Sequence, residues 1–185
     1  MNSKRISAAL IIAVAIVALI GLVATQSNVK GQRASAQQSA GATSPIHEQL
    51  PLCLGPFGCG TFVLDAGVAC SFPVEIALEG DLAQTTFFDS DGNPVRAIQT
   101  GQLDATVTNL DNGESTFLHI SGPAYLTFNA DASLNVRLIG PALLPMPGDT
   151  LLYNDGTIQL GVAPDGSVTL LRRVGHSIDV CAILG

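Results

Sequence analysis

The stretch VEIALE, residues 74–79, alternates apolar and polar side chains and decides the fold class. Val74, Ile76 and Leu78 fall on one side of an extended chain, and Glu75 and Glu79 fall on the other. Successive side chains of a β-strand point to opposite faces. The pattern therefore predicts a strand with one buried and one solvated face, as is typical of antiparallel sheets. Residues 134–138 and 157–162 repeat it.

Further strand-like runs extend on both sides of this stretch. They lie near residues 84–89, 95–99, 103–110, 115–121, 124–129, 150–153, 167–173 and 177–183. The steps DGN, DNG, NDG and PDG separate such runs, and Asx-Gly pairs suit tight hairpins because they tolerate positive φ. We therefore predict an all-β, antiparallel sandwich or barrel of about ten short strands joined by hairpins, without a long helix.

An apolar segment near the N-terminus indicates export. Residues 6–24 contain no charge and follow Lys4 and Arg5, which is the pattern of a signal peptide. Because about 20 apolar residues span a bilayer as a helix, retention as a membrane anchor stays open. The triplet Ala34-Ser35-Ala36 suits signal peptidase and favours cleavage, although it lies far from the apolar run.

A linker and one domain follow this segment. Residues 25–49 are rich in Gln, Ser, Ala and Gly and lack apolar periodicity, so we expect a flexible linker. Residues 50–185 are expected to form the all-β domain, and residues 1–24 the signal or anchor. Basic residues ahead of an apolar segment stay in the cytoplasm. We therefore expect an extracellular domain that is secreted or anchored, with membrane contact only through the N-terminal segment.

The charges of the domain exclude one class of partner. All fifteen acidic residues lie at Glu48 or later, whereas only four arginines and no lysine follow His47. Four positive against fifteen negative side chains leave a formal charge of −11. Such a surface repels phosphate backbones, which argues against nucleic-acid binding. Solubility outside the cell is the favoured explanation of this acidity, and cation binding is the alternative.

Four cysteines in an exported chain predict disulfides. Three pairings of Cys53, Cys59, Cys70 and Cys181 are possible. We favour Cys53–Cys59, which brackets a Gly/Pro turn, together with Cys70–Cys181, which would tie the start of the domain to its end. The spacings do not follow C-x-x-C repeats, so a zinc or redox site is the weaker interpretation.

Four stretches carry a family resemblance: AGVACSFPVEI, FFDSDGNPVRAIQTG, TNLDNGEST and GHSIDVCAIL. Together they resemble a family of uncharacterised small secreted β-domains of Gram-positive bacteria, over roughly residues 67–184. The resemblance implies an exported β-domain and supports the pairing of Cys70 with Cys181. Cys53 and Cys59 fall outside the shared pattern. It implies no catalytic residue and no cofactor.

Asp89, Asp91 and Asn93 sit two residues apart, as calcium ligands do. A helical calcium loop requires Gly at its sixth position and Glu at its twelfth, but Pro94 and Thr100 stand there. Strand-like residues also flank the segment on both sides. We therefore favour a hairpin turn over a metal site, and a β-type calcium site with carboxylates from another loop stays open.

Catalytic patterns are weak. His119 and His176 would need a nucleophile within hydrogen-bond reach and an orienting group, and Ser71 and Ser177 lack a G-x-S-x-G context. No H-E-x-x-H motif appears. Glu75 and Glu79 would form a glycosidase pair only beside a cleft, so a solvated strand face is favoured. No catalytic residue, metal ligand or cofactor is predicted.

The segment GPALLPMPGDT, residues 140–150, is the candidate binding surface. Leu143, Leu144 and Met146 alternate with prolines, which cannot donate to a central ladder. The segment is therefore expected to cross between sheets or to run along an edge. Outward-facing apolar side chains would make a partner patch, whereas inward-facing ones would cover the core.

These observations predict a non-catalytic, secreted or surface-anchored module that binds an extracellular protein or envelope component, or is a structural part of the cell envelope. A secreted hydrolase with a dispersed site and a calcium-stabilised adhesin are the alternatives.

Overall fold

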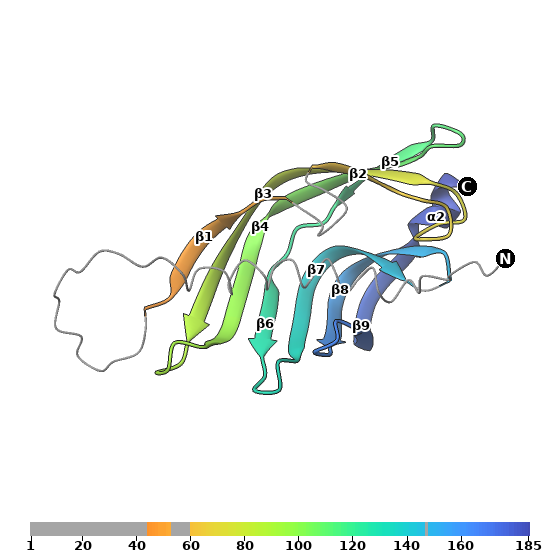
Figure 1. Cartoon of the computed structure of the whole chain (residues 1–185). Helices are drawn as coiled ribbons and strands as arrows, with labels where there is room; N and C mark the ends of the chain where they lie inside the picture. Colours follow the sequence, from red (N-terminus) through yellow and green to blue (C-terminus); the bar gives the residue numbers. More distant parts are fainter. Residues whose placement is uncertain (1–43, 53–59, 147) are drawn as a thin grey trace.

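A computed structural model describes residues 44–52, 60–146 and 148–185 (Figure 1). The elements in chain order are β1 (Ile46–Leu50), β2 (Thr61–Leu64), β3 (Val74–Phe88), β4 (Pro94–Asn109), β5 (Ser115–His119), β6 (Ala124–Phe128), β7 (Leu134–Met146), β8 (Thr150–Val162), β9 (Val168–Asp179) and the helix α2 (Val180–Leu184). No helix in the described ranges is long and apolar enough to cross a membrane.

The strand β1 begins earlier than the sequence indicated. Residues 46–49, which were expected to belong to the linker, lie in β1.

The strands form one antiparallel sheet of nine members. Its order is β1-β3-β4-β6-β7-β8-β9, while β2 pairs with β3 and β5 pairs with β4. Figure 1 shows this sheet as a strongly curved surface, with β1 and β9 at its two ends. The prediction of an antiparallel all-β fold is confirmed. The finer prediction of a sandwich or barrel stays a prediction.

Fewer and longer strands are present than the sequence indicated, because several glycines bend strands instead of ending them. Gly101 lies within β4, and a β-carbon there would stand 2.0 Å from the carbonyl oxygen of Asp81. Gly156 lies within β8, at 2.1 Å from that of Val174. Only glycine permits such close approach of neighbouring backbones. The NDG step at 154–156 was predicted as a hairpin turn, and that prediction was wrong.

The other three Asx-Gly steps do form the hairpins that were predicted. Turns follow β3, β4 and β8 at residues 89–93, 110–114 and 163–167. A similar turn joins β6 to β7, and there Ala132 takes the left-handed conformation, at φ 63°, that glycine takes in the others. The Asx-Gly steps therefore predicted the hairpins correctly at these three positions, where the chain reverses direction.

The first hydrophobic core, core 1, lies where β2–β5 pack against the start of β8 and α2. Its fully buried members include Val74 of β3, Val107 of β4 and Leu151 of β8. The Cys70–Cys181 disulfide is part of this core, with Cα atoms 5.5 Å apart and 111 residues between the cysteines. We call this region the disulfide end.

The helix α2 corrects a second prediction, since residues 177–183 were expected to continue as a strand. The strand ends at Asp179, whose Oδ1 accepts a hydrogen bond of 3.0 Å from the backbone N–H of Cys181. This carboxylate caps the helix, and the Asn109 and Asn112 side chains donate to the carbonyl oxygen of Leu184 at 3.0 and 2.9 Å. The local cap by Asp179 and the long-range bonds to Leu184 thus override the alternating pattern.

The second core, core 2, covers one face of β4, β6, β7 and β8. Its buried members are Ala97, Ala124, Leu126, Leu134, Val136, Ile158, Leu160 and Val162. Buried amides continue this face toward β3, where Gln99 Nε2 donates to Gln84 Oε1 at 2.8 Å and Gln84 Nε2 donates to Thr86 Oγ1 at 3.0 Å. We call the part of the sheet that carries core 2 the arginine end, because of the side chains on its opposite face.

Candidate functional site

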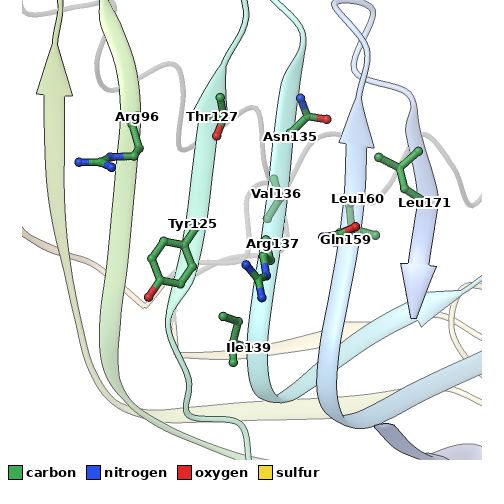
Figure 2. A pocket seen from close by; sticks show the side chains of 10 residues that line it. All are labelled: Arg96, Tyr125, Thr127, Asn135, Val136, Arg137, Ile139, Gln159, Leu160 and Leu171. Atoms are coloured by element: carbon green, nitrogen blue, oxygen red, sulfur yellow. The ribbon is translucent and has the colours of Figure 1, made fainter. Parts of the chain in front are cut away.

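A hollow of about 620 Å³ lies at the arginine end, over β4, β6, β7, β8 and β9 (Figure 2). We call it the arginine hollow. Its lining residues are Arg96, Tyr125, Thr127, Asn135, Val136, Arg137, Ile139, Gln159, Leu160 and Leu171.

Strand register places the polar lining residues side by side. Tyr125 of β6 pairs with Arg137 of β7, which pairs with Gln159 of β8. Residues directly opposite each other in a ladder point to the same face. The intervening residues Leu126, Val136 and Leu160 are buried in core 2, and Val136 and Leu160 also contribute to the lining of the hollow. The same alternation that buries core 2 therefore presents the side chains of the hollow.

A second row of paired residues runs beside the first. Arg96 of β4 pairs with Thr127 of β6, which pairs with Asn135 of β7. Figure 2 shows the two rows as adjacent levels, with Thr127 and Asn135 in one and Tyr125, Arg137 and Gln159 in the other. The hydroxyl, amide and guanidinium groups of these rows thus line the hollow together with four aliphatic residues, Val136, Ile139, Leu160 and Leu171.

The β9 edge of the hollow contains an irregularity in the ladder. The register between β8 and β9 shifts at Gln159/Leu160, where Leu171 is the extra residue. Leu171 side-chain atoms approach the position of a β-carbon on Gly161 to 3.5 Å, so this leucine borders the hollow. Arg172 pairs with Gln159 and therefore shares the face of the hollow, whereas Arg173 pairs with the core residue Ile158. Three of the domain's four arginines thus share one face.

These arginines are not neutralised by acidic side chains. Among residues 44–52, 60–146 and 148–185 the one side-chain ion pair joins His119 to Asp104, and it involves no arginine. The Arg96 guanidinium lies 4.3 Å from the centre of the Phe87 ring in a cation–π contact, which orients the group while it stays exposed. Arg137 and Tyr125 are also exposed, and Tyr125 retains 37% of its surface.

The same face carries the opposite charge at the disulfide end. Glu75 and Glu79 lie on the Phe87 side of β3, and Asp104 pairs with Glu79 from β4. The rows of Arg96 and Arg137 contain no carboxylate between β3 and β9. An acidic domain therefore concentrates its positive charge at one place, where an anion is attracted locally.

The Asp89, Asp91 and Asn93 segment forms the favoured hairpin turn. Asp89 Oδ1 accepts hydrogen bonds from the backbone N–H groups of Asp91 at 2.9 Å and Asn93 at 2.8 Å. These bonds, led by that from Asn93, lower the pKa of Asp89. No group of three or more potential metal ligands occurs in the described residues. A β-type calcium site at Asp89, Asp91 and Asn93 was the alternative that the sequence left open, and it stays untested.

The two candidate histidines lie apart from the hollow. His119 of β5 contacts Asp104 through Nδ1 on an exposed strand face, beside Phe117. His176 of β9 is exposed opposite Asp155, and the Ser177 hydroxyl donates to Asn154 Oδ1 at 2.7 Å. Within the described residues no hydroxyl group is hydrogen-bonded to either histidine. The structure therefore does not bring together the parts of a catalytic triad there.

The segment of Leu143, Leu144 and Met146 is the second half of β7. It pairs with β8 alone, since β6 ends its pairing at Leu138, so the prolines stand along an edge as expected. Leu143 packs against core 1, Leu144 packs against core 2, and all three side chains are partly buried. These contacts favour the covering role, and a binding role for the segment stays a prediction.

The disulfide Cys70–Cys181 is present as predicted. Cys53 and Cys59 lie outside the described residues, and their pairing stays a prediction. Comparison with models of protein families, with curated proteins and with solved structures finds no match for this chain.

Sequence reasoning missed the arginine hollow, although one signal was present. Arg96, Arg137, Arg172 and Arg173 are the domain's entire set of cationic side chains outside histidine. Each arginine lies in a run of alternating apolar and polar residues, so its position in that run indicates which face of the strand it occupies. The order of β4, β6, β7, β8 and β9 in the sheet was the missing information, because it alone brings three of them together.

Proposed function

We propose that this protein is a non-catalytic, exported or surface-anchored binding module of the cell envelope, and that the arginine hollow is its ligand site. The observation that carries the proposal is the placement of Arg96 and Arg137, unpaired with carboxylates, in one hollow of an otherwise acidic domain. The export pattern of residues 1–24 supports the location outside the cell.

The chemistry of the hollow selects an anionic ligand. A guanidinium offers several N–H donors in a plane and pairs bidentately with carboxylate or phosphate. Thr127, Asn135 and Gln159 add neutral donors and acceptors, and the Tyr125 ring adds an apolar surface with a polar tip. Because Arg96, Tyr125 and Arg137 are exposed to solvent, the hollow suits an extended ligand that lies across strands better than a small molecule that must be enclosed.

Cosedimentation with envelope material tests this proposal. The full chain, kept in an uncharged detergent, is mixed with cell walls of the producing organism and centrifuged. We expect the unmodified chain to pellet with the walls and the R96Q/R137Q/R172Q triple variant to stay in the supernatant. The single variants R137Q and R173Q are the charge-matched pair, because each loses one positive charge. Arg173 lies on the other face, so R173Q should still pellet, whereas R137Q should pellet less. Equal pelleting of the triple variant would exclude the hollow as the site.

A further inference from the structure

We infer that the hollow binds a linear acidic polysaccharide that crosses the strands, with its carboxylates on alternate sugars. This inference rests on the proposed function and names the ligand class of the same site. It follows from the order in which charged and neutral side chains succeed one another across the sheet.

The arginines occur on every second strand. Arg96 lies on β4, Arg137 on β7 and Arg172 on β9, while β6 and β8 lie between them in the sheet. Neighbouring strands are about 4.8 Å apart, so the arginine-bearing strands repeat at about 10 Å. That interval is roughly the length of a disaccharide. Arg137 and Arg172 both pair with Gln159 and lie in one row, whereas Arg96 lies in the neighbouring row. A chain that alternates one charged and one uncharged sugar, and that crosses the strands obliquely, would therefore meet an arginine at each charge.

The strands between the arginines carry neutral groups that suit uncharged sugars. Tyr125 and Thr127 lie on β6, and Gln159 lies on β8 between Arg137 and Arg172. Hydroxyl and amide groups exchange hydrogen bonds with sugar hydroxyls, and an aromatic ring packs on the apolar face of a pyranose. A phosphodiester polymer offers fewer hydroxyls for these groups, so the glycan is favoured.

The hollow also restricts the direction of the ligand. Leu171 lines the hollow beside Gly161 at the β9 end, and Ile139 lines it two residues beyond Arg137 on β7. Acidic residues occupy the same face toward the disulfide end, where Glu79 and Asp104 pair. These carboxylates would repel a polyanion that ran along the strands, so the ligand is confined to a path across them.

Isothermal titration of the full chain in uncharged detergent tests the inference. The probes are a hyaluronan hexasaccharide, in which every second sugar carries a carboxylate, its carboxyl-reduced neutral form, and poly(glycerol phosphate). We expect the acidic hexasaccharide to bind and the neutral form to bind at least about tenfold more weakly, because charge-assisted hydrogen bonds are lost. Stronger binding of poly(glycerol phosphate) than of the acidic hexasaccharide would overturn the glycan assignment.

Two matched variants locate the binding. R137Q should weaken binding of the acidic hexasaccharide by about tenfold or more, whereas R173Q should change it less than about twofold. Both variants lose one positive charge, so a difference between them reports position and not net charge. Equal effects would overturn the inference. Failure of the hexasaccharide to bind, while cell walls still pellet the chain in an Arg137-dependent way, would reject the ligand class and leave the proposed function standing.

Discussion

Val74 and Cys70 at the disulfide end are completely buried, whereas Arg96, Tyr125 and Arg137 at the arginine end stand exposed on the same sheet. At the disulfide end, β2–β5 pack against β8 and α2, and a covalent bond joins the two parts. At the arginine end, core 2 occupies one face and the other face carries the hollow. The contrast indicates that stability is concentrated where the sheet is covered, which leaves the uncovered face available for a ligand.

Removal of the disulfide should have the largest effect. The C70S/C181S variant releases a loop of 111 residues, and the chain-entropy model assigns such a loop about 4.8 kcal/mol of the free energy of unfolding. Urea denaturation followed by circular dichroism measures the loss. A loss below about 1 kcal/mol would show that core 1 holds this end without the covalent bond.

A β-carbon at a strand bend should have the next largest effect. G156A places a methyl group against the carbonyl oxygen of Val174, at 2.1 Å before relaxation, and should lower the free energy of unfolding by about 2–3 kcal/mol. G161A in the same strand is the control, because the nearest atoms there belong to the flexible Leu171 side chain at 3.5 Å. It should cost less than about 0.5 kcal/mol. Equal costs in urea denaturation would contradict the role of Gly156 as a bend.

A glycine substitution in the turn between β6 and β7, at the arginine end, should raise the free energy of unfolding. Ala132 adopts φ 63° between β6 and β7, a conformation that costs a non-glycine residue about 1–2 kcal/mol. A132G should therefore raise the free energy of unfolding by about 0.5–1 kcal/mol, after the entropy cost of glycine is subtracted. A130G in the same turn relieves no such strain and should lower stability. An increase in the free energy of unfolding from both substitutions would show that the gain does not come from relief of the positive φ at Ala132.

The smallest expected effect is on the pH dependence of the Tm in the acidic range. In the same turn the Ser133 hydroxyl donates to Asp131 Oδ1 at 2.6 Å, which lowers the pKa of Asp131. A carboxyl group with a lowered folded pKa stabilises the fold above its unfolded pKa of about 3.9, and this contribution disappears as the pH falls through the folded pKa. S133A should therefore lower the Tm at pH 5, and the difference from the unmodified chain should shrink below pH 3. A difference that is constant across this range would assign the effect of Ser133 to something other than the ionised carboxylate.

Much of the fold could be predicted because its main signals are local. Alternation at 74–79 fixes which side chains of β3 are buried, and the Asx-Gly steps at 91–93, 111–113 and 164–166 mark true reversals. The NDG step at 154–156 has the same composition but continues a strand. Its difference is tertiary, since Gly156 lies directly against the backbone of β9 at Val174 and Gly175. A sequence alone does not reveal such contacts.

The candidate site was less predictable for the same reason. The export segment suggested a binding module, but Arg96 and Arg137, which line the hollow, are 41 positions apart, and Arg172 on the same face follows 35 positions later. Their meeting depends on β5 leaving the main path of the sheet, so that β6 pairs with the first half of β4. Apolar residues between prolines indicated instead Leu143, Leu144 and Met146. Leu143 and Leu144 are partly buried because they pack against core 1 and core 2.

The most direct test of the account is amide chemical-shift mapping of the isotope-labelled full chain, in uncharged detergent, during titration with the hyaluronan hexasaccharide. The account predicts shift changes at Tyr125, Arg137 and Gln159 and at their neighbours on β4 and β9, with none at Val74, Val107 or Leu184 of the disulfide end. Changes centred on Leu143, Leu144 and Met146, or on the acidic face of Glu79 and Asp104, would contradict it.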